Sequence, residues 1–197
     1  MGLALRHFLR DMTLLVQGEA DPGRQQRGGR DLLRSLVRQA DWLDEAFRAS
    51  TPGFRQLLLY NDPLDRFSLV AFIWGTESRE TPIHDHGLWG AIGMLEGAEI
   101  STEMIPDAAG GPMRPGRQDE LRTGEVMLLG AGSYDIHKTA NARPGAPAIT
   151  IHLYGGNIGS VERRIYNEAN SAATLMRSGY DNPVLPNPWT QPVAVLA

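Results

Sequence analysis

Two histidines separated by a single residue are the part of the chain whose spacing most directly predicts chemistry. His84 and His86 flank Asp85, and alternate residues of a β-strand point to one face, so both imidazoles are able to bind the same metal ion. His137 follows further along the chain, beyond the glycine-rich stretch 124–132. Three protein ligands leave coordination positions open for other molecules, which is typical of a catalytic metal site rather than a structural one.

A second group of polar side chains alternates with isoleucine and leucine between positions 149 and 154. Thr150, His152 and Tyr154 fall on one face of the predicted strand and leave the other face apolar. A hydroxyl, an imidazole and a phenol at this spacing can form a hydrogen-bonded chain, in which Thr150 orients His152 and His152 orients Tyr154. The alternative is a half-buried strand whose polar face meets solvent. We favour the functional interpretation.

The composition restricts the metal and the partners. The 197 residues carry a net charge of -4 and include no cysteine. Any metal must therefore be held by nitrogen and oxygen donors, and no nucleic-acid partner is expected. No segment reaches the roughly 18 apolar residues that a membrane span needs. Charged residues interrupt the amino-terminal stretch, so we expect a cytoplasmic protein with no membrane partner.

Two amphipathic helices are predicted to open the chain. Apolar residues recur at three- and four-residue spacing from Leu5 to Val16, and again from Leu32 to Phe47 after a candidate helix cap at Asp31. The segment 18–29, rich in glycine, arginine and glutamine, is predicted to be a flexible connection between them.

From about residue 54 the pattern changes to short apolar runs bounded by turn residues, which predicts a β-sandwich or β-barrel. The runs occupy residues 57–60, 67–74, 89–95, 99–104, 125–129 and 148–154. We expect one domain over residues 1–197, with a helical part (1–50), a barrel (54–167) and an extended tail (168–197) in which four prolines lie between positions 183 and 192.

Three of the histidines have the spacing of the two metal motifs of a cupin, a small jelly-roll-like β-barrel; His7, on the first helix, is assigned no role. Cupins commonly supply a glutamate shortly after the histidine pair, but Trp89, Gly90 and Ala91 occupy that stretch here. A divalent metal held by three neutral imidazoles keeps more positive charge than one bound by a carboxylate. Such a metal favours an anionic donor such as a thiolate.

Residues 54–167 resemble the cysteine dioxygenase family of thiol dioxygenases, which are cupins that use mononuclear non-haem Fe(II) and O2 to convert a thiol into a sulfinate. The resemblance implies that His84, His86 and His137 hold Fe(II). The family's Ser-His-Tyr strand, which lines the oxygen pocket, is matched by Thr150, His152 and Tyr154, where threonine is a departure that keeps the hydroxyl.

Two further positions concern the substrate. Animal members bind the substrate carboxylate with an arginine in a Tyr-x-Arg segment, and Gln56 stands at that place in the run Phe54-Arg55-Gln56. This resembles the bacterial branch of the family, whose members prefer 3-mercaptopropionate. Those members bind the substrate carboxylate with an arginine that lies shortly after the oxygen-pocket strand. The resemblance implies that Arg163 has this role, with Arg164 as the alternative.

The same branch lacks the cysteine that is crosslinked to the pocket tyrosine in animal members. This chain has Gly90 near that position and no cysteine anywhere, so we expect Tyr154 to be an unmodified phenol.

Other functions remain open at the level of sequence. Cysteine or mercaptosuccinate is the alternative thiol, and Arg55 would give the latter a second anion contact. A non-catalytic cupin that binds zinc or nickel is the alternative of another class, because imidazole suits these metals as well. Carbon-carbon bond cleavage in a diketone also occurs on three-histidine cupins, but it leaves Arg163 and the polar strand without a use. The sequence does not define the oligomeric state.

Overall fold

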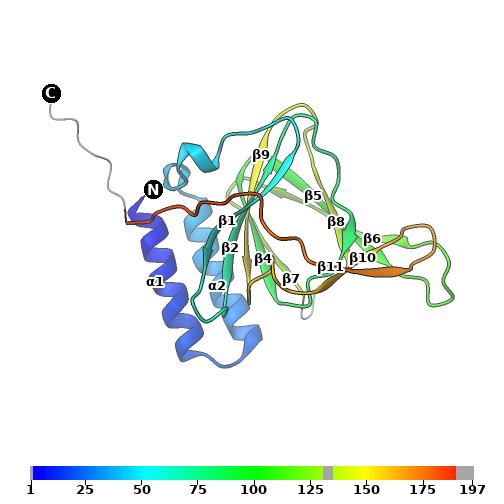
Figure 1. Cartoon of the computed structure of the whole chain (residues 1–197), viewed down its shortest axis with the longest axis horizontal. Helices are drawn as coiled ribbons and strands as arrows, with labels where there is room; N and C mark the ends of the chain where they lie inside the picture. Colours follow the sequence, from blue (N-terminus) through cyan, green and yellow to red (C-terminus); the bar gives the residue numbers. More distant parts are fainter. Residues whose placement is uncertain (1, 131–134, 190–197) are drawn as a thin grey trace.

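The computed structural model describes residues 2–130 and 135–189, in which two helices are followed by β-strands that form two sheets (Figure 1). The helices are α1 (Leu3–Gly18) and α2 (Pro22–Val37), followed by two short 3-10 turns, Ala40–Trp42 and Glu45–Phe47. The strands are β1 (Phe54–Asn61), β2 (Ser68–Trp74), β3 (Ile83–His84), β4 (Gly90–Glu96), β5 (Ala98–Ile105), β6 (Arg114–Arg122), β7 (Val126–Leu129), β8 (His137–Asn141), β9 (Ala148–Tyr154), β10 (Arg163–Tyr166) and β11 (Ala173–Met176).

All strand pairings among the described residues are antiparallel. One sheet has the order β1-β2-β9-β4-β7 and the other has the order β11-β10-β3-β8-β5-β6. The strand order of both sheets departs from the order in the chain, because the chain crosses between the sheets repeatedly, for example from β2 to β3 and from β4 to β5. The predicted mainly β, jelly-roll-like fold with two amino-terminal helices is confirmed.

The central strands β2 and β9 are buried along their whole length because both faces of the five-stranded sheet are covered. One face packs on α1 and α2 through alternate residues such as Leu69 and Ile151. The opposite face, which carries Phe72 and Tyr154, packs in a second core with residues from both sheets. The polar face of β9 therefore looks into the space between the sheets, and the solvent-facing alternative does not hold.

The N-cap of helix α2 lies ten residues earlier than the cap predicted at Asp31. Asp21 is the N-cap, its carboxylate accepts a hydrogen bond from the backbone N–H of Arg24 at 2.7 Å, and Pro22 occupies the first helical turn. The prediction of a flexible connection over residues 18–29 is therefore wrong. None of the described helices is long and apolar enough to cross a membrane.

Two glycines inside α2 led to the wrong prediction of a flexible connection. Close packing explains why glycine occupies both positions. A Cβ atom on Gly28 would lie 2.8 Å from Leu15 Cδ2, and one on Gly29 would lie 2.8 Å from Leu153 Cδ2. A side chain at either position would push the helix away from α1 or from the sheet. Glycine is unfavourable inside a helix, but at these two positions it allows α2 to pack closely against α1 and the sheet.

A single polar side chain joins α2 to the strand that follows the histidine pair. Gln26 is buried, with 3% of its surface exposed, and its amide nitrogen donates to the carbonyl oxygens of Gly90 at 2.9 Å and of Leu129. These carbonyls belong to the paired ends of β4 and β7. The contact fixes the helix layer at the end of the sheet nearest the histidines.

The strands that the apolar runs did not predict are short or polar. Of β6, only Leu121 is buried, and the rest of the strand is mostly exposed and rich in charged residues. Strand β11 pairs with β10 inside the segment predicted to be an extended tail. Beyond it the chain has no further regular element up to residue 189 and lies along β1, where Asp181 N donates to Gln56 O at 2.9 Å (Figure 1).

Replacing Gln26 by leucine is expected to destabilise the fold by about 1–3 kcal/mol, because two buried carbonyls lose their donor. Urea unfolding of Gln26→Leu against the parent chain measures this. Arg27→Leu, at the exposed neighbouring position of α2, is the matched control and should leave the unfolding free energy nearly unchanged. Equal effects of the two substitutions would contradict a structural role for the Gln26 amide.

Candidate metal centre

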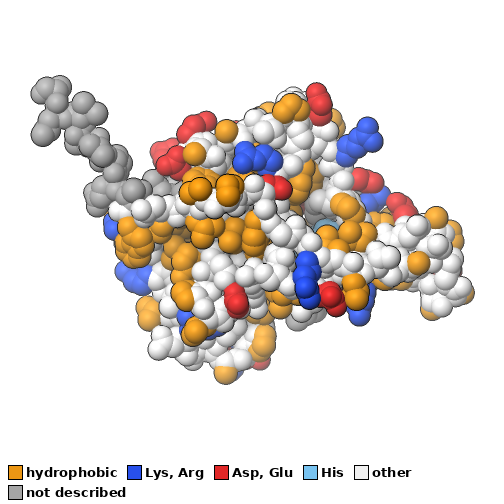
Figure 2. Space-filling model, in the orientation of Figure 1, with side chains coloured by type: hydrophobic (Ala, Val, Ile, Leu, Met, Phe, Trp, Pro, Cys, Tyr) orange, Lys and Arg blue, Asp and Glu red, His pale blue; other side chains and the backbone are white. Residues whose placement is uncertain are grey.

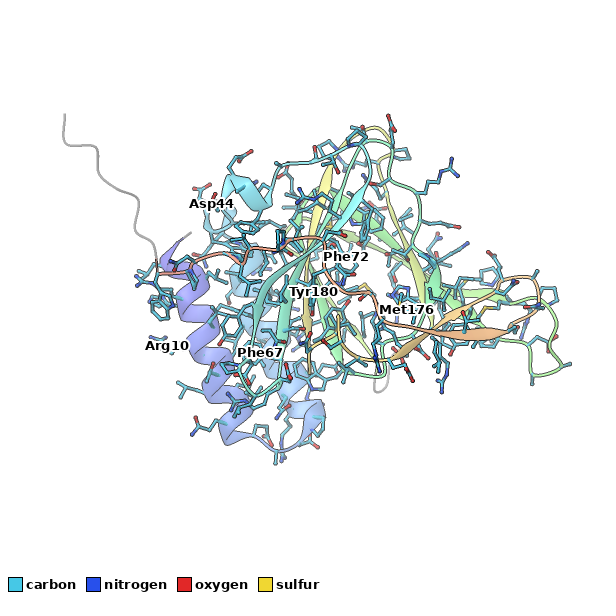
Figure 3. All side chains as sticks on the ribbon, viewed as in Figure 1. Arg10, Asp44, Phe67, Phe72, Met176 and Tyr180 are labelled. Atoms are coloured by element: carbon cyan, nitrogen blue, oxygen red, sulfur yellow. The ribbon has the colours of Figure 1, made fainter. Side chains whose placement is uncertain are left out.

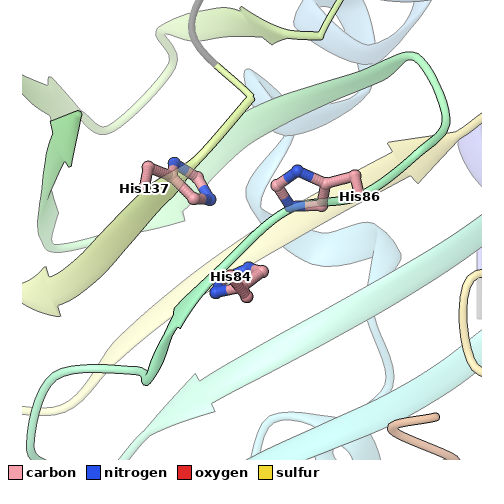
Figure 4. A group of neighbouring side chains, drawn as sticks. All are labelled: His84, His86 and His137. Atoms are coloured by element: carbon pink, nitrogen blue, oxygen red, sulfur yellow. The ribbon is translucent and has the colours of Figure 1, made fainter. Parts of the chain in front are cut away.

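Three imidazoles converge between the sheets (Figure 4). His84 ends β3, His137 begins β8, and the two residues are paired in register. His86 lies just beyond the end of β3, so the alternation predicted for a strand continues into the following segment. The three ring centroids lie 4.9 to 5.0 Å apart, and one nitrogen of each ring lies within 4.8 Å of the others. The predicted histidines are therefore brought together.

Each imidazole is oriented by a hydrogen bond at Nδ1, which leaves Nε2 as the nitrogen available to a metal. A carbonyl or a carboxylate can only accept, so two of the rings must carry their hydrogen on Nδ1. Such partners fix the tautomer and the ring orientation of metal-binding histidines. The partners are Pro82 O for His84 (2.8 Å), Asp135 Oδ1 for His86 (2.9 Å) and Ser101 Oγ for His137 (2.9 Å).

Burial keeps His84 and His137 in the neutral form that binds metals. Burial, followed by the neighbouring histidines, lowers the pKa of His84 to about 3 and holds the pKa of His137 well below its usual value. A neutral imidazole has a free lone pair, so no proton must be displaced at neutral pH. The three buried histidines thus fit a divalent metal with nitrogen donors.

Asp85, between the two histidines, points away from the triad and joins β3 to β10. Its carboxylate accepts from the backbone N–H of Arg164 at 2.8 Å, from Arg164 Nη1 at 3.2 Å and from Tyr166 OH at 2.9 Å. Arg164 is half exposed and engaged in this ion pair. Its neighbour Arg163 points the opposite way and has 7% of its surface exposed.

Arg163 and His84 line the same cavity, which has a volume of about 380 Å³. The Arg163 side chain has no hydrogen bond or ion pair with any described residue, and its Nε is fully buried. A buried guanidinium without an anion is costly, so this cavity favours an anionic occupant. Figure 2 shows histidine surface inside a hollow of the molecule, and Figure 3 labels two of the apolar lining residues, Phe72 of β2 and Met176 of β11.

Gln56 also lines the cavity, and its amide group anchors the carboxy-terminal segment. Its Nε2 donates to Ser178 Oγ at 3.0 Å and to Gly179 O at 2.8 Å. Arg55, which sequence reasoning offered as a second anion contact, does not line this cavity and donates to Ala49 O at 3.3 Å. Arg177 lines it instead.

The polar face of β9 forms the predicted hydrogen-bonded chain. Thr150 Oγ1 lies 2.9 Å from His152 Nε2, and His152 Nδ1 lies 3.0 Å from Tyr154 OH. Phe72 stacks on the His152 ring, and Tyr154 stacks on His86 of the triad. Burial lowers the pKa of His152 and raises the pKa of Tyr154, so both groups are neutral at neutral pH.

Gly90 explains why β4 places no carboxylate beside the triad. A Cβ atom at this position would lie 3.0 Å from Tyr154 Cδ1, because the tyrosine ring fills the space that a side chain on β4 would need. The chain has no cysteine, so the tyrosine carries no thioether crosslink.

Three polar residues of the site were missed by sequence reasoning: Ser101, Asp135 and Glu99. Glu99 is fully buried on β5, and its Oε2 accepts from Trp74 Nε1 at 3.2 Å and from Thr150 Oγ1 at 3.3 Å. Burial raises its pKa to about 8. The alternation of Glu99 and Ser101 with apolar residues in a predicted strand was the signal that could have identified both.

No protein-family model matches the chain. Solved structures that resemble it include a cupin superfamily protein, an oxidase and a dioxygenase. Oxalate oxidase in complex with the substrate analogue glycolate is 15% identical to this chain. The match covers 56% of this chain and 55% of the oxalate oxidase chain, with a TM-score of 0.40. Hydroquinone 1,2-dioxygenase in complex with Cd²⁺ and 4-hydroxybenzonitrile is 14% identical (57% and 70% covered, TM-score 0.43).

A cupin superfamily protein from Desulfitobacterium hafniense is 13% identical (56% and 84% covered, TM-score 0.40). The chain spans about half the length of the oxalate oxidase that it matches.

Replacing Ser101 by alanine is expected to weaken metal binding about 10–100-fold, because His137 loses the partner that orients its ring. Titration of the full chain with Zn²⁺ against a chromogenic chelator measures the affinity. Ser35→Ala, at an exposed position of α2, is the control and should bind Zn²⁺ like the parent. Unchanged affinity in Ser101→Ala would show that His137 is not a ligand or needs no partner.

Proposed function

We propose that the protein is a non-haem Fe(II) thiol dioxygenase that oxidises a small carboxylated thiol to its sulfinate with O2. The preferred substrate in this proposal is 3-mercaptopropionate. The observation that carries the proposal is the common cavity of Arg163 and His84. This cavity contains a guanidinium, which attracts a carboxylate, and one histidine of the three-histidine metal site. A small molecule with an acid at one end and a thiol at the other matches this arrangement.

Arg163 would bind the substrate carboxylate. A guanidinium presents two parallel N–H groups that match a carboxylate, and the low exposure of Arg163 strengthens this pairing. The opposite end of the substrate then points to the triad, and the apolar walls formed by Phe54 and Phe72 exclude water from the carbon chain.

Fe(II) bound by the three Nε2 atoms would supply the redox centre at which a thiol and O2 react. The net reaction, RSH + O2 → RSO2H, needs no further reductant, since both oxygen atoms end on sulfur and the proton passes to the acid product. Tyr154 stands next to His86 and is held by His152. Its phenol orients the reacting groups by hydrogen bonding, and the buried surroundings strengthen that bond.

The charges of the cavity favour an acid without an ammonium group. Two guanidinium groups, Arg163 and Arg177, line it together with one carboxylate, Asp181, which already accepts from Gln56 N. Arg177 pairs with Glu162 at 3.5 Å, whereas Arg163 has no such partner among the described residues. The α-ammonium group of cysteine would therefore meet the positive charge of Arg163. Arg177 offers mercaptosuccinate a contact for its second carboxylate, so this dianion is the second candidate substrate.

Oxygen uptake across a panel of thiols tests the proposal. After anaerobic loading with Fe(II), we expect 3-mercaptopropionate to be oxidised with the highest kcat/KM, mercaptosuccinate less efficiently, and cysteine and cysteamine least. One sulfinate should form for each O2 consumed. His86→Ala is the inactive control. Tight zinc binding without oxygen uptake for any thiol would refute the dioxygenase and favour the non-catalytic metal-binding alternative.

Replacing Arg163 by alanine is expected to lower kcat/KM for 3-mercaptopropionate about 10–100-fold, since a charge-assisted hydrogen-bonded pair is worth roughly 1.5–3 kcal/mol. Cysteamine, which lacks a carboxylate, should not lose activity, and iron loading should be unchanged. Arg164→Ala is the matched control, because that side chain pairs with Asp85 outside the cavity. If Arg164→Ala alone affected the carboxylated thiol, the assignment of Arg163 would be wrong.

A further inference from the structure

Glu99 is a buried carboxyl group that the proposed reaction does not use. It lies in the middle of the molecule on β5, with none of its surface exposed. Its Oε1 has no hydrogen-bond partner, while Oε2 contacts Trp74 and Thr150. Burying a polar group in this way costs free energy. Glu99 stands at the end of the Thr150–His152–Tyr154 chain, and this position suggests a functional reason for its burial.

The direction of the hydrogen bonds follows from donor counting when Glu99 is ionised. The carboxylate can only accept, so the single hydroxyl hydrogen of Thr150 is donated to Glu99 Oε2. Thr150 Oγ1 must then accept from His152 Nε2–H. The neutral imidazole has no hydrogen left for Nδ1, so His152 Nδ1 accepts from the hydroxyl of Tyr154. Tyr154 presents only lone pairs to the metal site.

The direction reverses when Glu99 is protonated on Oε2. The acid then donates to Thr150, Thr150 donates to His152 Nε2, and His152 Nδ1–H donates to the oxygen of Tyr154. The phenol hydrogen is now free to point toward the triad. Trp74 Nε1–H is compatible with both states, because Oε2 retains a lone pair in each.

We propose that Glu99 is the fourth member of this hydrogen-bonded chain, and that its protonation sets the tautomer of His152 and decides whether Tyr154 offers a donor or an acceptor to the metal site. Glu99 is thus a positioning residue that acts through Thr150. The inference concerns the protein's own hydrogen bonds and holds whichever substrate the site takes.

The surroundings of Glu99 contain no competing titratable side chain among the described contacts. Trp74 faces it from β2 and Thr150 from β9, and its backbone neighbours are Leu121 of β6 and Asn141 of β8. The next titratable groups are His152 and Tyr154 of the chain itself, both neutral at neutral pH. With burial raising the pKa of Glu99 to about 8, the reversal falls close to neutral pH.

Nitrogen-15 NMR of histidine distinguishes the two tautomers directly. The probe is the full chain loaded with diamagnetic Zn²⁺, titrated from about pH 6 to about pH 10. The His152 signals are identified by their loss in His152→Asn. We expect the Nδ1–H tautomer at low pH and the Nε2–H tautomer at high pH, with a midpoint near the Glu99 pKa of about 8. The tautomer ratio should change about tenfold per pH unit around that midpoint.

Three variants make the test specific. In Glu99→Gln, Trp74 Nε1–H requires a carbonyl oxygen at the Oε2 position, so Thr150 must donate and His152 should stay Nε2–H at every pH. Thr150→Val cuts the chain and should abolish the pH step. Glu96→Gln, at an exposed carboxylate paired with Arg48, is the matched control and should behave like the parent.

Thermal unfolding verifies that each variant is folded. A single His152 tautomer across the whole pH range in the parent chain would overturn the proposal, and so would a pH step that persists in Glu99→Gln or in Thr150→Val. None of these readouts depends on thiol oxidation, so a failure here is distinct from a failure of the proposed dioxygenase function.

Discussion

The site depends on three imidazoles whose Nδ1 atoms are all held by the protein. A carbonyl before β3, a carboxylate before β8 and a hydroxyl of β5 each orient one ring, so the Nε2 atoms face a common centre before any metal arrives. This preorganisation requires that the second sheet brings β3, β8 and β5 side by side. The five-stranded sheet, closed on its outer face by α1 and α2, completes the enclosure in which the three imidazoles are buried.

The two sheets contribute different functional groups to the site. The six-stranded sheet supplies the histidines and, from β10, the guanidinium of Arg163, while β9 of the other sheet supplies the polar chain that ends at Tyr154. Asp85 and Gly90 make this division possible. Asp85 pairs with Arg164, so that Arg163 and not Arg164 lines the cavity, and Gly90 leaves room for the tyrosine ring against the triad.

Local patterns were enough to predict much of this. Alternation placed Thr150, His152 and Tyr154 on one face, and the His84–His86 spacing survives even though β3 ends at His84. The partners Ser101 and Asp135 come from segments far away in the chain, and no local pattern links them to a histidine. Helix α2 was misjudged because glycines normally end helices, whereas here close packing requires them. Residues 131–134, which include the end of the glycine-rich stretch before His137, lie outside the described residues.

We propose that one cavity joins a three-histidine iron site to a carboxylate-binding arginine. An anaerobic crystal structure of the Fe(II)-loaded chain with 3-mercaptopropionate tests it most directly. We expect iron on the Nε2 atoms of His84, His86 and His137, with the substrate sulfur toward the iron and the substrate carboxylate on Arg163. Iron held elsewhere, or a substrate carboxylate bound away from Arg163, would contradict it.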